Sequence, residues 1–127
     1  MRSRSLAGIG LGIAYLSQGA AHQAAAAFRD VATINRATTY ALFMVLAAVG
    51  EASAHRMAGA LDRAQATYEQ AIAWSVDHAH PSLLAGSLYT GLADLLRERN
   101  ELDAALDRAT EGLRLATELG AVGAERW

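Results

Sequence analysis

Glu51 and His55 are the first residues of this chain whose types and spacing suggest chemistry. They stand four positions apart, so on a helix the carboxylate and the imidazole share one face. One interpretation is a pH-responsive or ligand-reading pair, because histidine changes its charge near neutral pH. The other is a mutually satisfied pair at the edge of a helical hairpin, and this second interpretation is favoured.

Metal binding is another chemistry open to histidines, and His78 and His80 add two imidazoles to the chain. The HExxH pattern does not occur, however, and the four histidines fall on different predicted elements. The sequence contains no cysteine, which excludes disulfides, thiolate metal sites and thiol catalysis. We therefore expect neither a metal site nor a cofactor.

The acidic residues near the end of the chain are candidates for acid–base catalysis, which requires paired carboxylates in a pocket. They alternate instead with arginines, as on the solvated face of a helix. The acidic residues are Glu98, Glu101, Asp103 and Asp107, and the arginines are Arg97, Arg99 and Arg108. No nucleophile stands beside a base, and all eleven basic residues are arginines, which excludes lysine chemistry. We expect no catalytic residue and no enzymatic activity.

The apolar run from Leu6 to Leu16, which follows two arginines, is similar to a signal peptide. It is too short for a bilayer, which needs about 20 apolar residues. It also lies in register with later segments, so a buried first helix is the better interpretation. The formal net charge of −2 predicts no attraction to DNA or to an anionic membrane. We expect a cytoplasmic chain that has neither nucleic acid nor membrane as a direct partner.

Small residues recur along the chain at offsets of 40 and then 41 residues. One set is Gly12, Ala52 and Ala93, and a second set with the same offsets is Ala24, Ala64 and Ala105. Between the two sets stand Gly19, Gly59 and Asn100, residue types that take the left-handed conformation at the end of a helix. A fixed period of this length is typical of a helical-repeat array.

Two aromatic residues keep the same register. Phe28 and Tyr68 stand four positions after Ala24 and Ala64, on the same helix face, and Ala109 breaks the pattern in the third repeat. We expect each ring to fill the gap between its own repeat and the next.

This pattern predicts an all-α fold of three antiparallel helix hairpins, stacked as a right-handed superhelix in one domain over residues 1–127. The repeats are expected at about 3–37, 38–80 and 81–120. The predicted helices span 3–18, 20–36, 38–57, 60–78, 82–99 and 101–119, with Gly120 ending the last one. Residues from Gly123 onward are expected to begin another helix, so the chain is interpreted as a segment of a longer protein. Apolar surface at both ends predicts self-association into a homo-oligomer.

The spacing of small residues resembles the tetratricopeptide repeat, which makes the expected superhelix TPR-like. One passage is more specific: Pro81–Leu96 (PSLLAGSLYTGLADLL), followed by Asn100–Ala105 and Glu111–Leu113. It resembles the helical-repeat region of large ATP-dependent LuxR-family transcription activators, the MalT-like regulators, whose repeats are also near 40 residues long. The resemblance implies an ATPase before this region and a DNA-binding helix-turn-helix after it. In the best-known member the repeat region binds the inducing sugar.

The first helices of such an array line its concave wall, and here that wall changes from apolar in the first repeat to charged in the third. The candidate binding residues are Ile13, Leu16, Val49, Ser53, Arg56, Thr90, Asp94 and Arg97. One interpretation is an amphipathic groove for a ligand or peptide, with Arg56, Asp94 and Arg97 as polar anchors. The other is a solvated face with an Asp94–Arg97 ion pair at helical spacing.

The leading hypothesis is a non-catalytic, ligand-sensing or protein-interaction repeat segment of a bacterial LuxR/MalT-type regulator. Its partner would be a protein or a small-molecule effector. The alternative is a free-standing TPR-like adaptor that binds a peptide or protein partner. Adaptors that grip a peptide carboxylate use lysine and asparagine on the concave wall, and this chain has no lysine.

The chain contains neither a P-loop lysine nor a recognition helix, so we expect it to bind neither ATP nor promoter DNA by itself. Calorimetry with ATP and gel retardation with DNA check this expectation. Saturable heat of nucleotide binding, or salt-sensitive and sequence-specific retardation, would contradict it.

Overall fold

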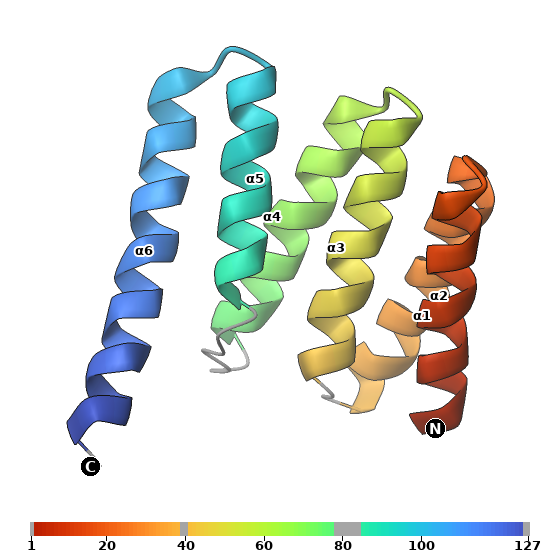
Figure 1. Ribbon diagram of the computed structural model, residues 1–127, viewed down its shortest axis with the longest axis horizontal. Helices are drawn as coiled ribbons and strands as arrows, with labels where there is room; N and C mark the ends of the chain where they lie inside the picture. Colours follow the sequence, from red (N-terminus) through yellow and green to blue (C-terminus); the bar gives the residue numbers. More distant parts are fainter. Residues whose placement is uncertain (1, 39–40, 78–84, 126–127) are drawn as a thin grey trace.

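The computed structural model describes residues 2–38, 41–77 and 85–125. Within these ranges every element is an α-helix and no strand occurs, which confirms the all-α prediction. The helices are α1 (Arg2–Ser17), α2 (Ala21–Thr38), α3 (Ala41–Met57), α4 (Leu61–Asp77), α5 (Ala85–Glu98) and α6 (Leu102–Glu125). They form three antiparallel hairpins that stand side by side (Figure 1).

Among the described residues, the helix boundaries differ from the predicted ones by more than one residue in two places. Thr38 is the last residue of α2 rather than the first of the next helix. The last helix does not end at Gly120, because α6 continues to Glu125 and includes the first three residues of the segment that was expected to begin another helix. Glycine inside a helix costs only about 1 kcal/mol relative to alanine, so a helix passes through it where its neighbours favour helix. The predicted start of the fifth helix at Ser82 lies outside the described residues.

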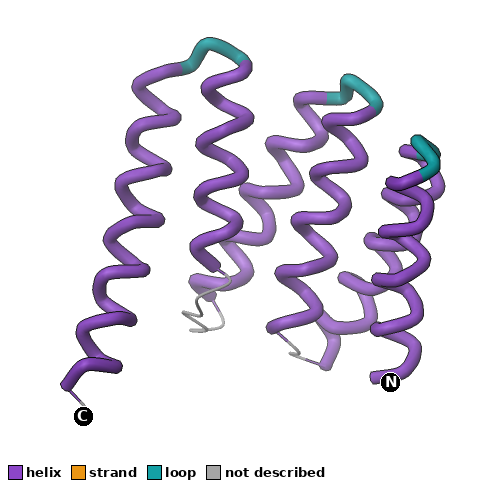
Figure 2. The backbone as a smooth tube through the Cα atoms, viewed as in Figure 1, coloured by secondary structure: helices purple, strands orange, loops and turns teal. Residues whose placement is uncertain are grey.

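The three hairpin turns, which lie at the same end of the molecule (Figure 2), share one hydrogen-bond pattern. Gly19, Gly59 and Asn100 have φ angles of 75°, 76° and 62°, the left-handed conformation that the sequence predicts. In the first turn the N–H of Gly19 donates to the carbonyl of Leu16 at 3.0 Å, and the N–H of Ala20 donates to that of Tyr15 at 2.9 Å. This is the Schellman motif, and both bonds recur in the other two turns.

The hairpins are joined by aromatic rings that lie against glycine backbones. Phe28 of α2 is only 2% exposed. A Cβ atom built on Gly12 of α1 or on Gly50 of α3 would come within 2.5 or 2.4 Å of its ring. Tyr68 of α4 repeats the contact one hairpin further on, where a Cβ on Gly91 of α5 would come within 2.6 Å of the phenol. The rings therefore fill the gaps between hairpins, as the sequence predicts.

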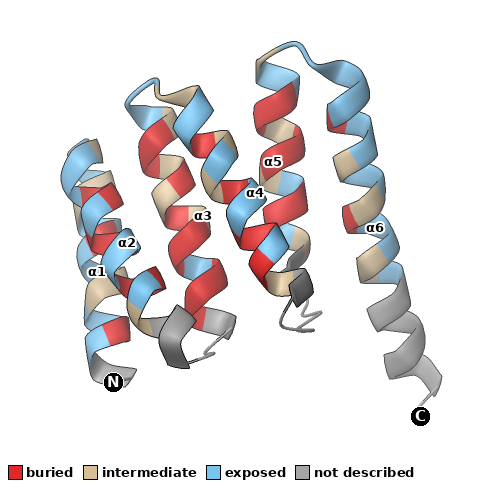
Figure 3. Ribbon diagram, turned by 180° about the vertical axis from the view of Figure 1, so that it is seen from behind, coloured by how far each residue is buried: buried red, intermediate tan, exposed pale blue. Residues whose placement is uncertain are grey.

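In Figure 1, α1, α3 and α5 lie in front of α2 and α4, and α6 lies beside α5 at the end of the array. Contacts join α1 to α3 and α3 to α5, whereas among the described residues none joins α2 to α4 or α4 to α6. The helices α1, α3 and α5 are therefore the more closely packed set, as expected of the inner, concave side of an array. Buried residues gather where the helices meet and cover much of α3 and α5 (Figure 3).

Replacing Gly50 by alanine is expected to lower the free energy of unfolding by about 1–3 kcal/mol, because its methyl group overlaps the Phe28 ring. Gly10→Ala is the matched control on α1, since no atom lies within 4 Å of the new methyl group. That change is expected to raise the free energy of unfolding by up to about 1 kcal/mol, because alanine favours helix. Urea denaturation measures both values. Equal effects of the two changes would contradict the ring contact.

Candidate functional site

The apolar members of the predicted wall are only partly available to a ligand. Ile13 is exposed, whereas Leu16 and Val49 are half-buried and pack against the two core clusters. Leu46 of α3 adds exposed apolar surface that was not among the predicted wall residues. The apolar end of the wall therefore consists of exposed side chains on α1 and α3.

The two hydroxyl groups of the wall donate to their own helices. Ser53 Oγ donates to the carbonyl of Val49 at 2.9 Å, and Thr90 Oγ1 donates to that of Gly86 at 2.9 Å. This back-bonding to the preceding turn is common for serine and threonine in helices. The hydroxyl oxygens remain able to accept a hydrogen bond. Ser53 and Thr90 can therefore meet a ligand as acceptors without disturbing the helices.

The charged members of the wall form one network between the second and third hairpins. Arg56 of α3 donates from Nη1 to Asp94 Oδ2 at 3.2 Å and from Nη2 to Glu98 Oε2 at 2.7 Å, both on α5. Arg97 donates to the other oxygen of Asp94 at 2.7 Å, so the predicted Asp94–Arg97 pair is present. The structure thus brings Arg56, Asp94 and Arg97 together, and it adds Glu98, which sequence analysis assigned to a solvated face.

This network changes the pKa values of its members. Hydrogen bonds from Arg97 and Arg56 hold the pKa of Asp94 below its ordinary value. Burial lowers the pKa of Arg56, but its hydrogen bonds to Glu98 and Asp94 outweigh burial and raise the pKa overall. Two guanidinium groups face two carboxylates, so the network carries no net charge. It is suited to hydroxyl-rich or zwitterionic groups more than to a simple anion.

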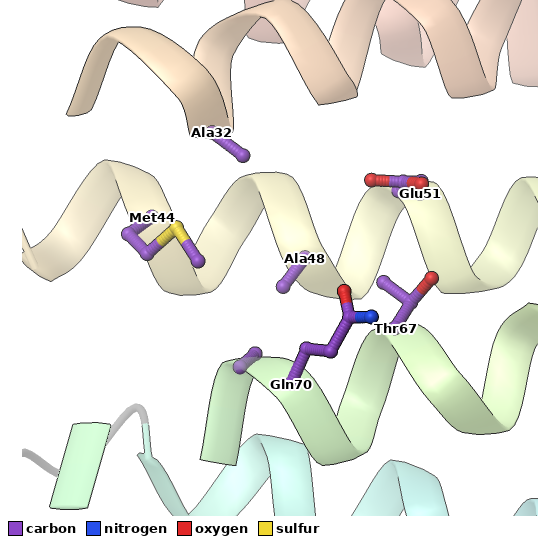
Figure 4. Close-up of a pocket in the computed structure, with 7 residues that line it drawn as sticks. Ala32, Met44, Ala48, Glu51, Thr67 and Gln70 are labelled. Atoms are coloured by element: carbon purple, nitrogen blue, oxygen red, sulfur yellow. The ribbon is translucent and has the colours of Figure 1, made fainter. Parts of the chain in front are cut away.

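Apart from the wall, a hollow lies over α3, between α2 and α4, and it was not predicted from the sequence. It is a shallow depression, wide open to solvent, with a volume of about 410 Å³, and it is lined by Arg29, Glu51, His55, Arg63, Ala66, Thr67 and Gln70. A smaller hollow adjoins it, where Thr67 and Gln70 of α4 are directed towards α3 (Figure 4). The guanidinium groups of Arg29 and Arg63 are exposed and offer fixed donors to carboxylate or hydroxyl groups.

Glu51 and His55 lie in this hollow as a mutually satisfied pair. His55 Nε2 is 3.1 Å from Glu51 Oε2, and the Nε and Nη2 atoms of Arg29 lie 3.4 and 3.5 Å from the same oxygen. His55 is only 7% exposed. The network explains how two polar residues stand where the first repeat has Leu11 and Tyr15. The contact between Phe28 and Gly50 also explains why Arg29 meets Glu51. Arg29 directly follows Phe28, and Glu51 directly follows Gly50.

In the described part of the chain, neither a metal-binding cluster nor a membrane-spanning helix is found. There, no group of three or more histidine, cysteine, aspartate or glutamate side chains is placed to hold a metal ion. His78 and His80 lie outside the described residues. None of the described helices combines the length and the apolar character needed to cross a membrane.

Comparisons with known proteins agree with the observed architecture. Residues 1–125 match the model of a family described as the MalT-like TPR region. Among solved structures, the crystal structure of the TPR domain of Arabidopsis FLU is similar, with a TM-score of 0.76 and 18% sequence identity. The similarity covers 91% of this chain and 98% of that chain, and at this identity it supports the fold alone. No curated protein sequence matches the chain.

Replacing Arg56 by alanine is expected to raise the pKa of Asp94 towards its ordinary value of 3.8, because one of its two hydrogen-bonded cations is lost. A carboxyl-detected NMR titration measures this shift. Glu111 is the internal control. Its pKa is lowered by Arg114, and both residues lie on α6, away from the network, so the pKa of Glu111 is expected to stay unchanged. An unmoved Asp94 titration in this variant would contradict the network.

The lowered pKa of Asp94 also predicts a pH dependence. Its folded pKa lies below its unfolded pKa, so its contribution to stability is full above pH 3.8 and is lost as the pH falls through the folded value. The carboxylate is 44% exposed, so Asp94→Asn is expected to cost only about 0.5 kcal/mol at pH 7. In urea denaturation that difference is expected to decrease below pH 3.8 and to vanish once the pH is below the lower, folded pKa of Asp94.

Proposed function

The chain belongs to the family of MalT-like TPR regions, and from this premise we propose that it is a non-catalytic interaction segment of a bacterial, cytoplasmic LuxR/MalT-type transcription regulator. The amphipathic wall formed by α1, α3 and α5 is the observation that carries the proposal. Ile13 is exposed at its apolar end, and the network of Arg56, Asp94 and Arg97 lies at its charged end. A protein segment or small-molecule effector with one apolar and one polar side complements this gradient.

The proposed ligand places its apolar side over Ile13, Leu16 and Val49 and its polar side over the charged network. Arg97 is the principal anchor, because its side chain is 70% exposed. Its hydrogen bond to Asp94 uses one of the five N–H groups of the guanidinium, so others are open to carboxylate or hydroxyl oxygens of the ligand. Ser53 and Thr90 supply acceptors between the two ends.

Ligand binding at this wall acts on a junction between hairpins. Arg56 ties α3 to α5 through Asp94 and Glu98. A ligand that replaces Asp94 or Glu98 as a partner of Arg56 changes the strength of the contact between the second and third hairpins. We propose that this change is how the segment reports binding to flanking parts of a regulator.

The apolar ends of the array support association with further protein. Exposed leucines on α6 stand at Leu102, Leu106 and Leu113, along one helix face. Two copies can bury these faces against one another in an isologous pair, which is the homo-oligomer expected from the sequence.

A free-standing TPR-like adaptor is the alternative function, and it uses the same wall. The length of the parent gene distinguishes the two. An ATPase before this region and a helix-turn-helix after it support the regulator, whereas a gene that encodes repeats alone supports the adaptor.

Arg97→Ala is expected to weaken binding of a wall ligand at least tenfold, which corresponds to about 1.4 kcal/mol, because a desolvated charged hydrogen bond is lost. The probe is a 12-residue peptide selected from a random library on the immobilised chain, with affinity measured by calorimetry. Arg114→Ala is the matched control, because Arg114 pairs with Glu111 three residues earlier on α6, as Arg97 pairs with Asp94 on α5. Affinity that survives both Arg97→Ala and Arg56→Ala would mean that the wall is only a solvated scaffold.

A further inference from the structure

The exposed face of α1 carries the same residue types that α3 uses to pack against the preceding hairpin. Ala7, Gly10 and Ala14 stand 40 positions before Ala47, Gly50 and Ala54, and the residue types are identical. On α3 both alanines are fully buried and Gly50 lies beneath the ring of Phe28. On α1 all three residues are exposed. The same receiving surface thus occurs twice, occupied on α3 and open on α1.

Gly10 is the open member of a set of three glycines that share one register. Its counterparts are Gly50, against which the Phe28 ring lies, and Gly91, against which the Tyr68 ring lies. No atom lies within 4 Å of the position that a Cβ would take on Gly10. Leu6 stands four positions before Gly10 on α1 and Leu11 directly follows it, and these two apolar side chains are 60% and 50% exposed. An open notch flanked by exposed leucines marks a contact surface.

We propose that the exposed face of α1 docks an amphipathic helix that seats a phenylalanine or tyrosine ring on Gly10. The two occupied junctions of the same molecule specify this occupant, since each seats an aromatic ring on the equivalent glycine. Ala7, Gly10, Leu11 and Ala14 are not among the wall residues, so docking on this face of α1 is separate from ligand binding at the wall.

The occupied junction also specifies the residue that directly follows the aromatic ring in the docked helix. At the occupied junction Arg29, which follows Phe28, contacts Glu51, which follows Gly50. On α1 the residue that follows Gly10 is Leu11. The occupant of α1 therefore carries an apolar residue directly after its ring, where α2 carries an arginine.

A second copy of the chain stacked end to end is a poor occupant of this face. The outer face of α6 would then meet α1, and it carries Ala109 at the position of Phe28 and Tyr68. Stacking in the same register would leave the notch at Gly10 without a ring, and a void of this kind forfeits packing contacts. The α1 face thus fits a ring-bearing helix of a different sequence.

The test is a fusion in which residues 1–40 are added once more before the full chain, so that the natural 40-residue offset is kept. The added hairpin brings its own Phe28 to Gly10 of the original α1. We expect a single unfolding transition with a higher urea midpoint than that of the unfused chain. Gly10→Ala in the original α1 is expected to abolish this gain, although the same change does not lower the midpoint of the unfused chain.

Arg29→Leu in the added hairpin alone is expected to raise the midpoint of the fusion further, because the new leucine meets Leu11. No gain in the midpoint, or a gain that survives Gly10→Ala, overturns the proposal. Sedimentation of the unfused chain then tests whether a second copy occupies this face. A dimer that Gly10→Ala converts to monomer would make a second copy the occupant and would also overturn it.

Discussion

The contact between an aromatic ring and a glycine backbone is the constraint on which the stack depends. Phe28 and Tyr68 lie so close to Gly50 and Gly91 that a single methyl group would overlap them. Helices approach one another this closely only where side chains at the contact are small. Each ring therefore sets both the distance and the register between one hairpin and the next. The continuity of the concave wall follows from that register.

Arginine contacts accompany the rings at both junctions. Arg29 reaches from α2 to Glu51 on α3, and Arg56 reaches from α3 to α5. These side chains are partly exposed, so each ion pair adds little to stability. Because each pair contributes little, these ion pairs can rearrange without disrupting the buried rings.

The two ends of the array are not equivalent. The α1 end exposes a glycine notch without a ring, and the α6 end exposes leucines and has Ala109 where a ring would stand. Size complementarity in packed interfaces depends on such pairs of large and small residues. The two exposed ends of the array therefore differ in shape and in residue size.

Local features of the fold were predictable from residue types and spacing. The six helices and the left-handed turns at Gly19, Gly59 and Asn100 depend on interactions between residues close in the chain. The continuation of α6 through Gly120 was not predicted, because the cost of a helical glycine is small and neighbouring residues decide the outcome. The Asp94–Arg97 pair was predictable for the same local reason, as its members are three residues apart on one helix.

By itself the sequence determined the all-α class, the repeat period, the hairpin turns and the lack of cysteine and lysine chemistry. Only the tertiary structure decided that Glu98 joins Arg56, that Arg29 reaches Glu51, and that the ring positions leave Gly10 open. The partners in the first two contacts are 42 and 22 positions apart. Their meeting depends on how one hairpin packs on the next, and spacing along a single helix carries no information about that packing.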